Sequence, residues 1–278
     1  MRKIILNRAY IRWILAIIIT LSAAMYQRMT GPTYPLRGKI NIEGRDIKYR
    51  LARSHGGDTN HAVSLSFPDS TYKAALRYTF FKANRPWETM PMKWENGQFT
   101  AELPNQPPAG KLEYYILISR QEQKYAIPPD RTVVIRFKGA VPALALIPHV
   151  VFMFFAMLIS NLSALEAFAK GKQLKIYTIL TTSLLFAGGI IFGPIVQRYA
   201  FGELWTGIPF GYDLTDNKTL VAMIGWLIAL VQVTRRDFRQ ARWWVVAAAV
   251  ILLLIYSIPH SMLGSELDYQ TMQVRTGQ

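Results

Sequence analysis

The stretch VPALALIPHVVFMFFAMLISNLS, residues 141–163, decides the fold of this chain. It contains no Asp, Glu, Lys or Arg, and a helix needs about 20 predominantly apolar residues to cross the hydrocarbon core of a bilayer. Similar apolar segments follow at residues 174–196, 219–233 and 243–263. The sequence therefore predicts a bundle of four transmembrane helices over residues 140–264, of which the third is short.

The N-terminal segment, residues 1–30, predicts a fifth transmembrane helix. Its first part, MRKIILNRAYIR, is basic, and the apolar run WILAIIITLSAAM follows. This combination is typical of an uncleaved signal anchor, which we favour, and also of a cleaved secretory signal with Ser22 and Ala24 near the cleavage site. Both interpretations place the residues that follow outside the cytoplasm.

Residues 31–139 differ from the rest because short alternating runs replace long apolar segments. The runs occupy residues 39–43, 46–53, 62–67, 74–82, 99–103, 112–119 and 132–137. They are rich in β-branched and aromatic residues, and turn signals such as Asn96-Gly97 separate them. Residues 87–116 resemble a recurring bacterial Ig-like pattern. We expect an α+β membrane protein with an extracytoplasmic Ig-like β-sandwich.

Basic clusters in the short loops predict the orientation in the membrane. Besides the N-terminal cluster, they are Lys170, Lys172 and Lys175, and then Arg235, Arg236, Arg239 and Arg242. Five crossings place all three clusters on one side, which the positive-inside rule makes cytoplasmic. We therefore expect a protein of the bacterial inner membrane with its N-terminus inside. The β-sandwich and a C-terminal tail, residues 265–278, are expected outside.

Composition narrows the function classes. The chain is 51% apolar and 18% charged, and its net charge is +15. Much of the basic excess flanks apolar segments, where it orients helices in lipid, so nucleic-acid binding is not expected. The absence of Cys excludes disulfides, thiolate metal sites and c-type haem attachment. The expected partners are the lipid bilayer and a protein at the extracytoplasmic face.

The loop WTGIPFGYDLTDNK, residues 205–218, is the first candidate site. Its candidate residues are Trp205, Thr206, Gly207, Asp213, Asp216, Asn217 and Lys218. Asp216 or Asn217 is a natural N-cap for the third bundle helix, and the aromatic residues suit a membrane interface. The Gly and Pro pattern predicts one fixed conformation packed against the bundle, the C-terminal segment or the sandwich. A functional loop and a structural lid both fit.

The segment IPHSMLGSELDY, residues 258–269, adds Glu266 and Asp268 from the other end of the bundle. Together with the 205–218 loop it resembles a motif pair of bacterial multi-pass membrane proteins that carry an Ig-like extracytoplasmic domain. This resemblance implies an architecture and no particular activity.

His149 and His260 are candidate ligands because ionisable residues in membrane segments usually face the bundle interior or a wet cavity. The predicted topology places both in the outer half of the membrane. Two imidazoles that face each other across a bundle are what bis-histidine haem b requires, so both are candidate cofactor and metal ligands. The alternatives are another ligand or proton-linked role, and plain hydrogen bonding to a carbonyl or an acid.

Two further histidines, His55 and His61, flank a Gly-Gly-Asp-Thr-Asn turn. That spacing could make a weak metal site, although solvated loop histidines are the simpler interpretation. The usual enzyme motifs for nucleophilic catalysis, nucleotide binding and metalloproteases are missing from the sequence. We therefore expect a non-catalytic binding or assembly component, with a haem-b electron carrier as the alternative.

Overall fold

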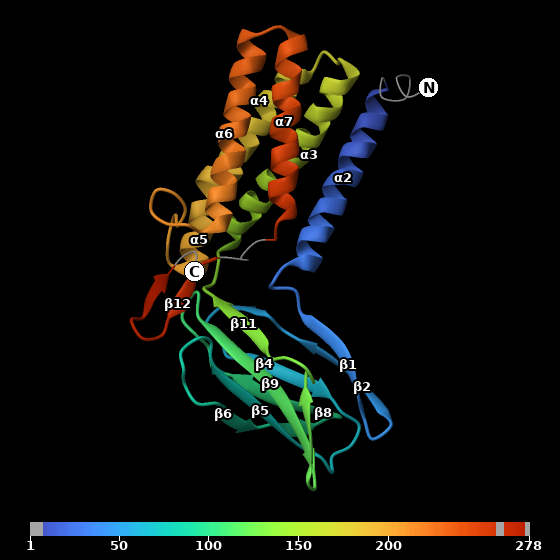
Figure 1. Ribbon diagram of the computed structural model, residues 1–278, viewed down its shortest axis with the longest axis vertical. Coiled ribbons are helices and arrows are strands. Elements are labelled where there is room, and N and C mark those ends of the chain that lie inside the picture. Colours follow the sequence, from blue (N-terminus) through green and yellow to red (C-terminus); the bar gives the residue numbers. More distant parts are fainter. Residues whose placement is uncertain (1–7, 260–263, 276–278) are drawn as a thin grey trace.

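The structure is a computed structural model that describes residues 8–259 and 264–275. Among these residues, five helices are long and apolar enough to cross a membrane. They are α2 (Ala9–Thr30), α3 (Ala143–Ala169), the continuous stretch Leu174–Phe201, α6 (Leu214–Arg235) and α7 (Phe238–Ser257). Figure 1 shows these helices at one end of the molecule and most strands at the other. The chain is thus an α+β protein with the helices expected of a membrane protein.

The third of these helices is not regular throughout. It runs through α4 (Leu174–Leu185), the π-helical segment η1 (Phe186–Phe192) and α5 (Gly193–Phe201). Gly188, in η1, lies so close to α3 that a Cβ there would come within 2.9 Å of the Phe152 side chain. Its lack of a side chain therefore allows close packing within the chain, which is the usual effect of small residues at membrane helix contacts.

The N-terminal helix packs on the other helices, so the expected arrangement of a separate anchor beside a four-helix bundle is wrong. Ala16, Thr20 and Ala23 of α2 are buried. Asn161 of α3 donates a hydrogen bond to the Thr20 hydroxyl at 3.0 Å, and Gln27 donates one to the Tyr256 carbonyl of α7 at 2.5 Å. Small residues spaced three and four apart place one smooth face of α2 against its neighbours.

The helix boundaries also differ from those expected. Helix α6 has 22 residues and begins at Leu214, so the expectation of a short third bundle helix is wrong. Helix α7 begins at Phe238 and ends at Ser257. The polar residues at the start of α6 are helical because Asp213, one turn earlier than expected, caps the helix: its side chain accepts a hydrogen bond from Thr215 N.

Along the sequence, the residues between α2 and α3 form three sheets. The six-stranded sheet has the order β3 (Ser54–Gly56), β11 (Val133–Lys138), β9 (Lys111–Arg120), β5 (Lys73–Phe80) and β6 (Glu88–Pro91), and β10 (Gln123–Ile127) also pairs with β9. The three-stranded sheet has the order β4 (His61–Ser66), β8 (Gln98–Leu103) and β7 (Lys93–Glu95). The third is the hairpin of β1 (Leu36–Ile42) and β2 (Arg45–Leu51). All seven expected runs correspond to strands.

One hydrophobic core joins these sheets. Its fully buried members include Leu51 from the hairpin, Leu65 and Phe99 from the three-stranded sheet, and Leu76 and Tyr114 from the six-stranded sheet. Alternate residues of β9 are buried, as expected of strands with one face on a core. The core therefore holds the three sheets together as one packed unit.

Backbone hydrogen bonds connect the sheets to the helices and to the C-terminal hairpin. Gly139, just after β11, donates a backbone hydrogen bond to the carbonyl of Ala200 in α5 at 3.0 Å. The second contact is the C-terminal hairpin of β12 (Glu266–Asp268) and β13 (Gln273–Arg275), whose Leu267 N donates to the Ala109 carbonyl at 3.1 Å. The residues after α7 thus return to the sheets.

Candidate functional site

Asp213 lies where the helices, the sheets and the C-terminal segment meet. Its side chain is 5% exposed, and its two carboxylate oxygens serve different elements. Oδ1 accepts from Thr215 N at 2.8 Å, and Oδ2 accepts from the backbone N of Ser265 at 3.1 Å and from the Ser265 hydroxyl at 3.4 Å. Asp213 therefore both caps α6 and holds the start of the C-terminal hairpin.

Arg136 of β11 reaches the same Ser265 from the sheet side. Its Nη2 donates to the Ser265 carbonyl at 2.9 Å, and its guanidinium carbon lies 5.4 Å from the centre of the Phe201 ring of α5. The side chain is 6% exposed. Burial lowers the pKa of Arg136, and the charges of Asp213 and Glu266 oppose that shift. We call this chain of contacts the Asp213–Ser265–Arg136 joint.

The loop before α6 is fastened to the first turns of that helix. Asp216 Oδ2 accepts hydrogen bonds from Thr206 N at 2.6 Å, from the Thr206 hydroxyl at 3.1 Å and from Gln197 Nε2 of α5 at 3.0 Å. Asn217 Oδ1 accepts from the backbone N of Ile208 at 2.8 Å. A Cβ on Gly207 would come within 2.7 Å of the Asp216 Cβ, so a side chain does not fit there.

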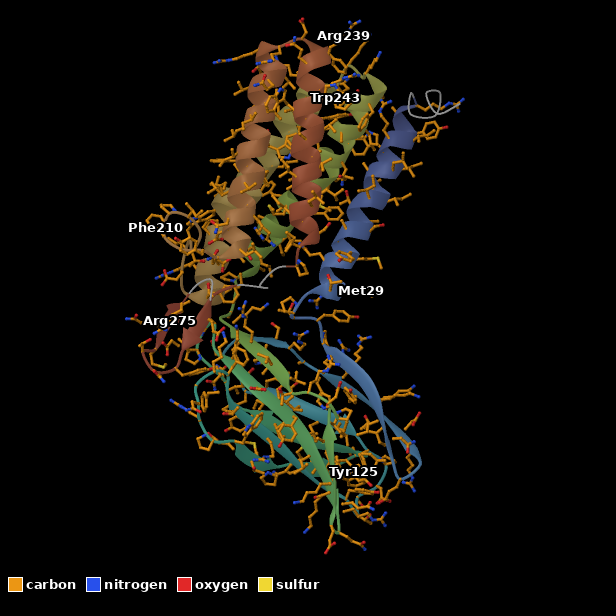
Figure 2. All side chains as sticks on the ribbon, in the orientation of Figure 1. Met29, Tyr125, Phe210, Arg239, Trp243 and Arg275 are labelled. Atoms are coloured by element: carbon orange, nitrogen blue, oxygen red, sulfur yellow. The ribbon has the colours of Figure 1, made fainter. Side chains whose placement is uncertain are left out.

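The tip of the loop presents apolar side chains outward. Trp205 Nε1 donates a hydrogen bond to the Ile208 carbonyl at 3.1 Å, which stabilises the conformation of the tip. Ile208, Phe210 and Tyr212 are 54%, 81% and 75% exposed. Figure 2 shows Phe210 projecting beside the end of the helices that lies nearer the strands. Aromatic residues at that level are typical of a membrane–water interface.

Lys218, near the start of α6, binds the backbone at the end of α7. It is 7% exposed, and its Nζ donates to the carbonyls of Ile258 at 3.0 Å and Pro259 at 3.4 Å. These carbonyls follow the last turn of α7, where no further helical N–H groups reach them. A cation at a helix C-terminus also complements the negative end of its dipole.

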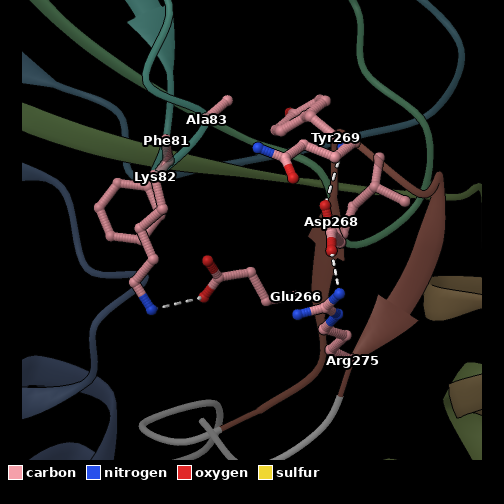
Figure 3. A pocket seen from close by; sticks show the side chains of 9 residues that line it. Phe81, Lys82, Ala83, Glu266, Asp268, Tyr269 and Arg275 are labelled. Carbon is pink, nitrogen blue, oxygen red and sulfur yellow. Dashed lines mark hydrogen bonds and ion pairs between the residues drawn. The ribbon is translucent and has the colours of Figure 1, made fainter.

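Glu266 and Asp268 line a recess between β12 and the residues that follow β5 (Figure 3). The recess has a volume of about 260 Å³ and is lined by Phe81, Lys82, Ala83, Glu266, Leu267, Asp268, Tyr269, Gln270 and Arg275. Glu266 Oε2 lies 2.7 Å from Lys111 Nζ and 3.5 Å from Lys82 Nζ. Asp268 pairs with Arg275 at 2.5 Å. The recess thus carries both signs of charge.

Tyr269 fixes the hairpin beneath this recess. Its hydroxyl accepts a hydrogen bond from Lys111 N at 2.9 Å and donates one to the Lys111 carbonyl at 3.0 Å. Burial raises the pKa of Tyr269 to about 12, so the phenol stays protonated and able to donate at neutral pH. The pKa of Lys111 is lowered by burial, which the hydrogen bond with Glu266 opposes.

His149 lies in the second turn of α3 and faces η1. Its Nδ1 is 2.9 Å from the carbonyl of Gly188, to which it donates. The other proposed haem ligand, His260, lies outside the described residues. Within residues 8–259 and 264–275, no cluster of three or more His, Cys, Asp or Glu side chains could hold a metal ion. The pairing of His149 with His260 remains a prediction.

Several residues that make these contacts were not singled out from the sequence. Arg136 lies in an ordinary strand, Ser265 in a short polar run, and Gln197 near the end of an apolar helix. No motif marks them. Glu166 was also missed because the first bundle helix was expected to end at residue 163. It is 1% exposed in α3, and its Oε2 pairs with Arg12 Nε of α2 at 2.9 Å.

Comparison with known proteins gives no relative: no family model, no curated protein and no solved structure matches the chain. The class of this protein is therefore defined by its own fold and site. In the part of the chain that the structure describes, it is an α+β protein with five helices apolar enough to span a membrane, joined to packed sheets through buried polar contacts.

Proposed function

We propose that this chain is a non-catalytic binding and assembly component of a membrane complex, which holds a β-domain at a fixed position over the bilayer and binds a protein partner with it. The Asp213–Ser265–Arg136 joint carries this proposal. Turning the sheets relative to the helices would pull Ser265 away from the buried carboxylate of Asp213 or from the buried guanidinium of Arg136. A buried charged group that loses its hydrogen-bond partner costs several kcal/mol, so the joint favours one orientation of the sheets.

The proposed division is a membrane helix in residues 1–30, an Ig-like β-sandwich in 31–139, a membrane helical region in 140–264 and a C-terminal segment in 265–278. The shared core of the six-stranded and three-stranded sheets supports the sandwich. The parallel pairing of β3 with β11 is a local variation on its largely antiparallel strands. The C-terminal segment belongs functionally with the sandwich because it packs on it through Leu267 and Tyr269.

The proposed location is a bacterial inner membrane, with the N-terminus in the cytoplasm and the sheets outside. Arg239 and Trp243 lie at the end of the helices far from the sheets (Figure 2), and the turn between α3 and α4 carries Lys170 and Lys172. Basic residues in short loops favour the cytoplasmic side. The exposed tip at Phe210 then lies at the outer interface.

The recess of Figure 3 is the proposed contact for the partner. It borders the joint, and its Lys82 side chain is 56% exposed, so a charged group of a partner can reach it. Lys82, Glu266 and Arg275 offer both donors and acceptors. Mixed charges of this kind give specificity and orientation more than raw affinity.

Site-specific photocrosslinking in membranes tests this proposal. A photoreactive amino acid at Ala83 or Gln270, which line the recess, should crosslink one defined partner, whereas the same group at Tyr125, at the far tip of the sheets (Figure 2), should not. Lys82→Glu should remove most of the crosslink, because it reverses the charge that the recess offers to the partner. The side chain is largely exposed, so this replacement should spare the fold. The same pattern at all three positions, or only crosslinks within the chain, would refute the proposal.

A second candidate function is electron transfer through haem b held by His149 and His260. The observation that favours it is the Nδ1 contact of His149 with Gly188, since ligating histidines usually donate their other ring N–H to a carbonyl or carboxylate. The protein purified in mild detergent should then show a Soret band, with α and β bands that sharpen on dithionite reduction. His149→Ala and His260→Ala should each abolish these bands. A colourless preparation from haem-supplemented cells would rule haem out.

A further inference from the structure

His55 and His61 meet at the edge where two sheets come together. His55 belongs to β3 of the six-stranded sheet, and His61 begins β4 of the three-stranded sheet. Their Nδ1 atoms are 3.2 Å apart and their ring centres 4.9 Å apart. Both side chains are half-buried, so the simpler expectation of solvated loop histidines does not describe them.

The surroundings of His55 fix its orientation and its tautomer. Its Nε2 is 2.8 Å from the carbonyl of Thr59, and only a protonated Nε2 can donate to that acceptor. In the neutral ring the Nδ1 of His55 therefore presents a lone pair toward His61. The ring also packs edge-on against Phe137, with centres 5.7 Å apart. A ring N–H bound to a carbonyl, with the other nitrogen free to coordinate, is the usual arrangement of a metal-binding histidine.

The spacing of the two nitrogens matches the bite of a metal ion. Two metal–nitrogen bonds of about 2.0–2.1 Å that meet near the tetrahedral angle place their nitrogens about 3.3–3.4 Å apart. The observed separation of 3.2 Å is only about 0.1–0.2 Å shorter than this spacing. A tautomer shift in His61 turns its Nδ1 from a donor into a second lone pair.

We propose that His55 and His61 form a two-imidazole binding site for a divalent transition-metal ion, which bridges β3 and β4 and takes its remaining ligands from solvent. Binding exchanges two metal-bound waters for two imidazole nitrogens and transfers no electrons. The order of affinities of nitrogen ligands for divalent ions makes Cu²⁺ the tightest binder, with Zn²⁺ and Ni²⁺ weaker. The bound ion links the six-stranded sheet to the three-stranded sheet on either side of the turn 57–60.

The test is titration of the full-length protein in detergent with CuCl₂, using an affinity tag that contains no histidine. We expect one equivalent of Cu²⁺ with an electron paramagnetic resonance spectrum that shows imidazole nitrogen coupling. We also expect a thermal midpoint raised by several degrees at saturating metal. His55→Asn and His61→Asn should each weaken binding at least tenfold, whereas Asp58→Asn in the same turn should not.

Two results would overturn the proposal. One is a His55→Asn/His61→Asn double variant that binds Cu²⁺ with the stoichiometry and affinity of the unaltered chain, since the ion would then be held elsewhere. The other is a Cu²⁺ spectrum of the unaltered protein without imidazole nitrogen coupling. The second result depends on no variant, so it stands even if a substitution at the sheet edge prevents folding.

Discussion

Replacing Asp213 with Ala should destabilise the protein and release the C-terminal hairpin. The substitution removes an N-cap, worth about 1 kcal/mol, together with hydrogen bonds that the buried charged carboxylate accepts, worth about 1.5–3 kcal/mol. We therefore expect the free energy of unfolding to fall by about 2–4 kcal/mol. Amide exchange in residues 264–275 should accelerate, because Ser265 N loses the carboxylate that it donates to. Denaturation in detergent and hydrogen-exchange mass spectrometry measure both effects.

A matched control separates the joint from an ordinary turn. Like Asp213, Asp69 accepts a hydrogen bond from the backbone N of the residue two positions later, Thr71, at 2.9 Å. Asp69, however, lies in an exposed turn of the sheets. Asp69→Ala should leave exchange in residues 264–275 unchanged. Asp213→Asn keeps a capping group and loses the charge, so its effect should lie between those of the two alanine variants. Unchanged exchange in Asp213→Ala would mean that the hairpin is held by the sheets alone.

The importance of Arg136 could not be predicted from strand periodicity. In β11 the side chains of Val133, Ile135 and Phe137 face the core, so alternation assigns Arg136 to the opposite, solvent-facing side. In the structure that side is covered by Ser265 and Phe201, which come from residues far away in the sequence. Local alternation shows which face a residue takes, and only the tertiary arrangement shows what covers that face.

The helices were predictable because length and hydropathy alone define them, yet their ends were not. Asp213 and Asp216 are both acceptable N-caps, and the tertiary contact decided between them. Asp213 takes the cap because Asp216 is used by Thr206 and Gln197, which approach α6 from the preceding loop and helix. The sequence marked the 205–218 loop as a candidate site by its Gly, Pro and Asp content. Its contacts depend on partners that no local pattern reveals.

Removing the Glu166 carboxylate should loosen α2 from the other helices. Glu166 pairs with Arg12 through Oε2, and the two side chains are 2% and 12% exposed. Breaking one partner of a buried ion pair typically costs about 3–5 kcal/mol, and we expect Glu166→Leu to lower the free energy of unfolding in detergent by that amount. The chain has no native Cys, so spin labels at cysteines introduced in α2 and α3 can report the separation of the helices.

The matched variants identify the ion pair as the cause. Arg12→Met combined with Glu166→Leu should recover much of the loss, because both charges then leave the apolar region together. Arg8→Met removes an exposed basic residue from the start of the same helix and should change little. If the double variant is no more stable than Glu166→Leu alone, the loss comes from other contacts of Glu166, such as the hydrogen bond that its Oε1 accepts from Gln173 N at 3.1 Å.

The position of Glu166 explains why its effect should reach beyond α2. A Cβ on Gly171 would lie 1.8 Å from the Glu166 Oε1, so the turn between α3 and α4 leaves room only for this carboxylate. One acid therefore orders both the turn and the packing of the N-terminal helix. Since α2 leads directly into β1, a looser α2 should also alter how the sheets are held. Spin-label distances that broaden in Glu166→Leu at α2, and stay narrow between α6 and α7, would locate the change at this end of the bundle.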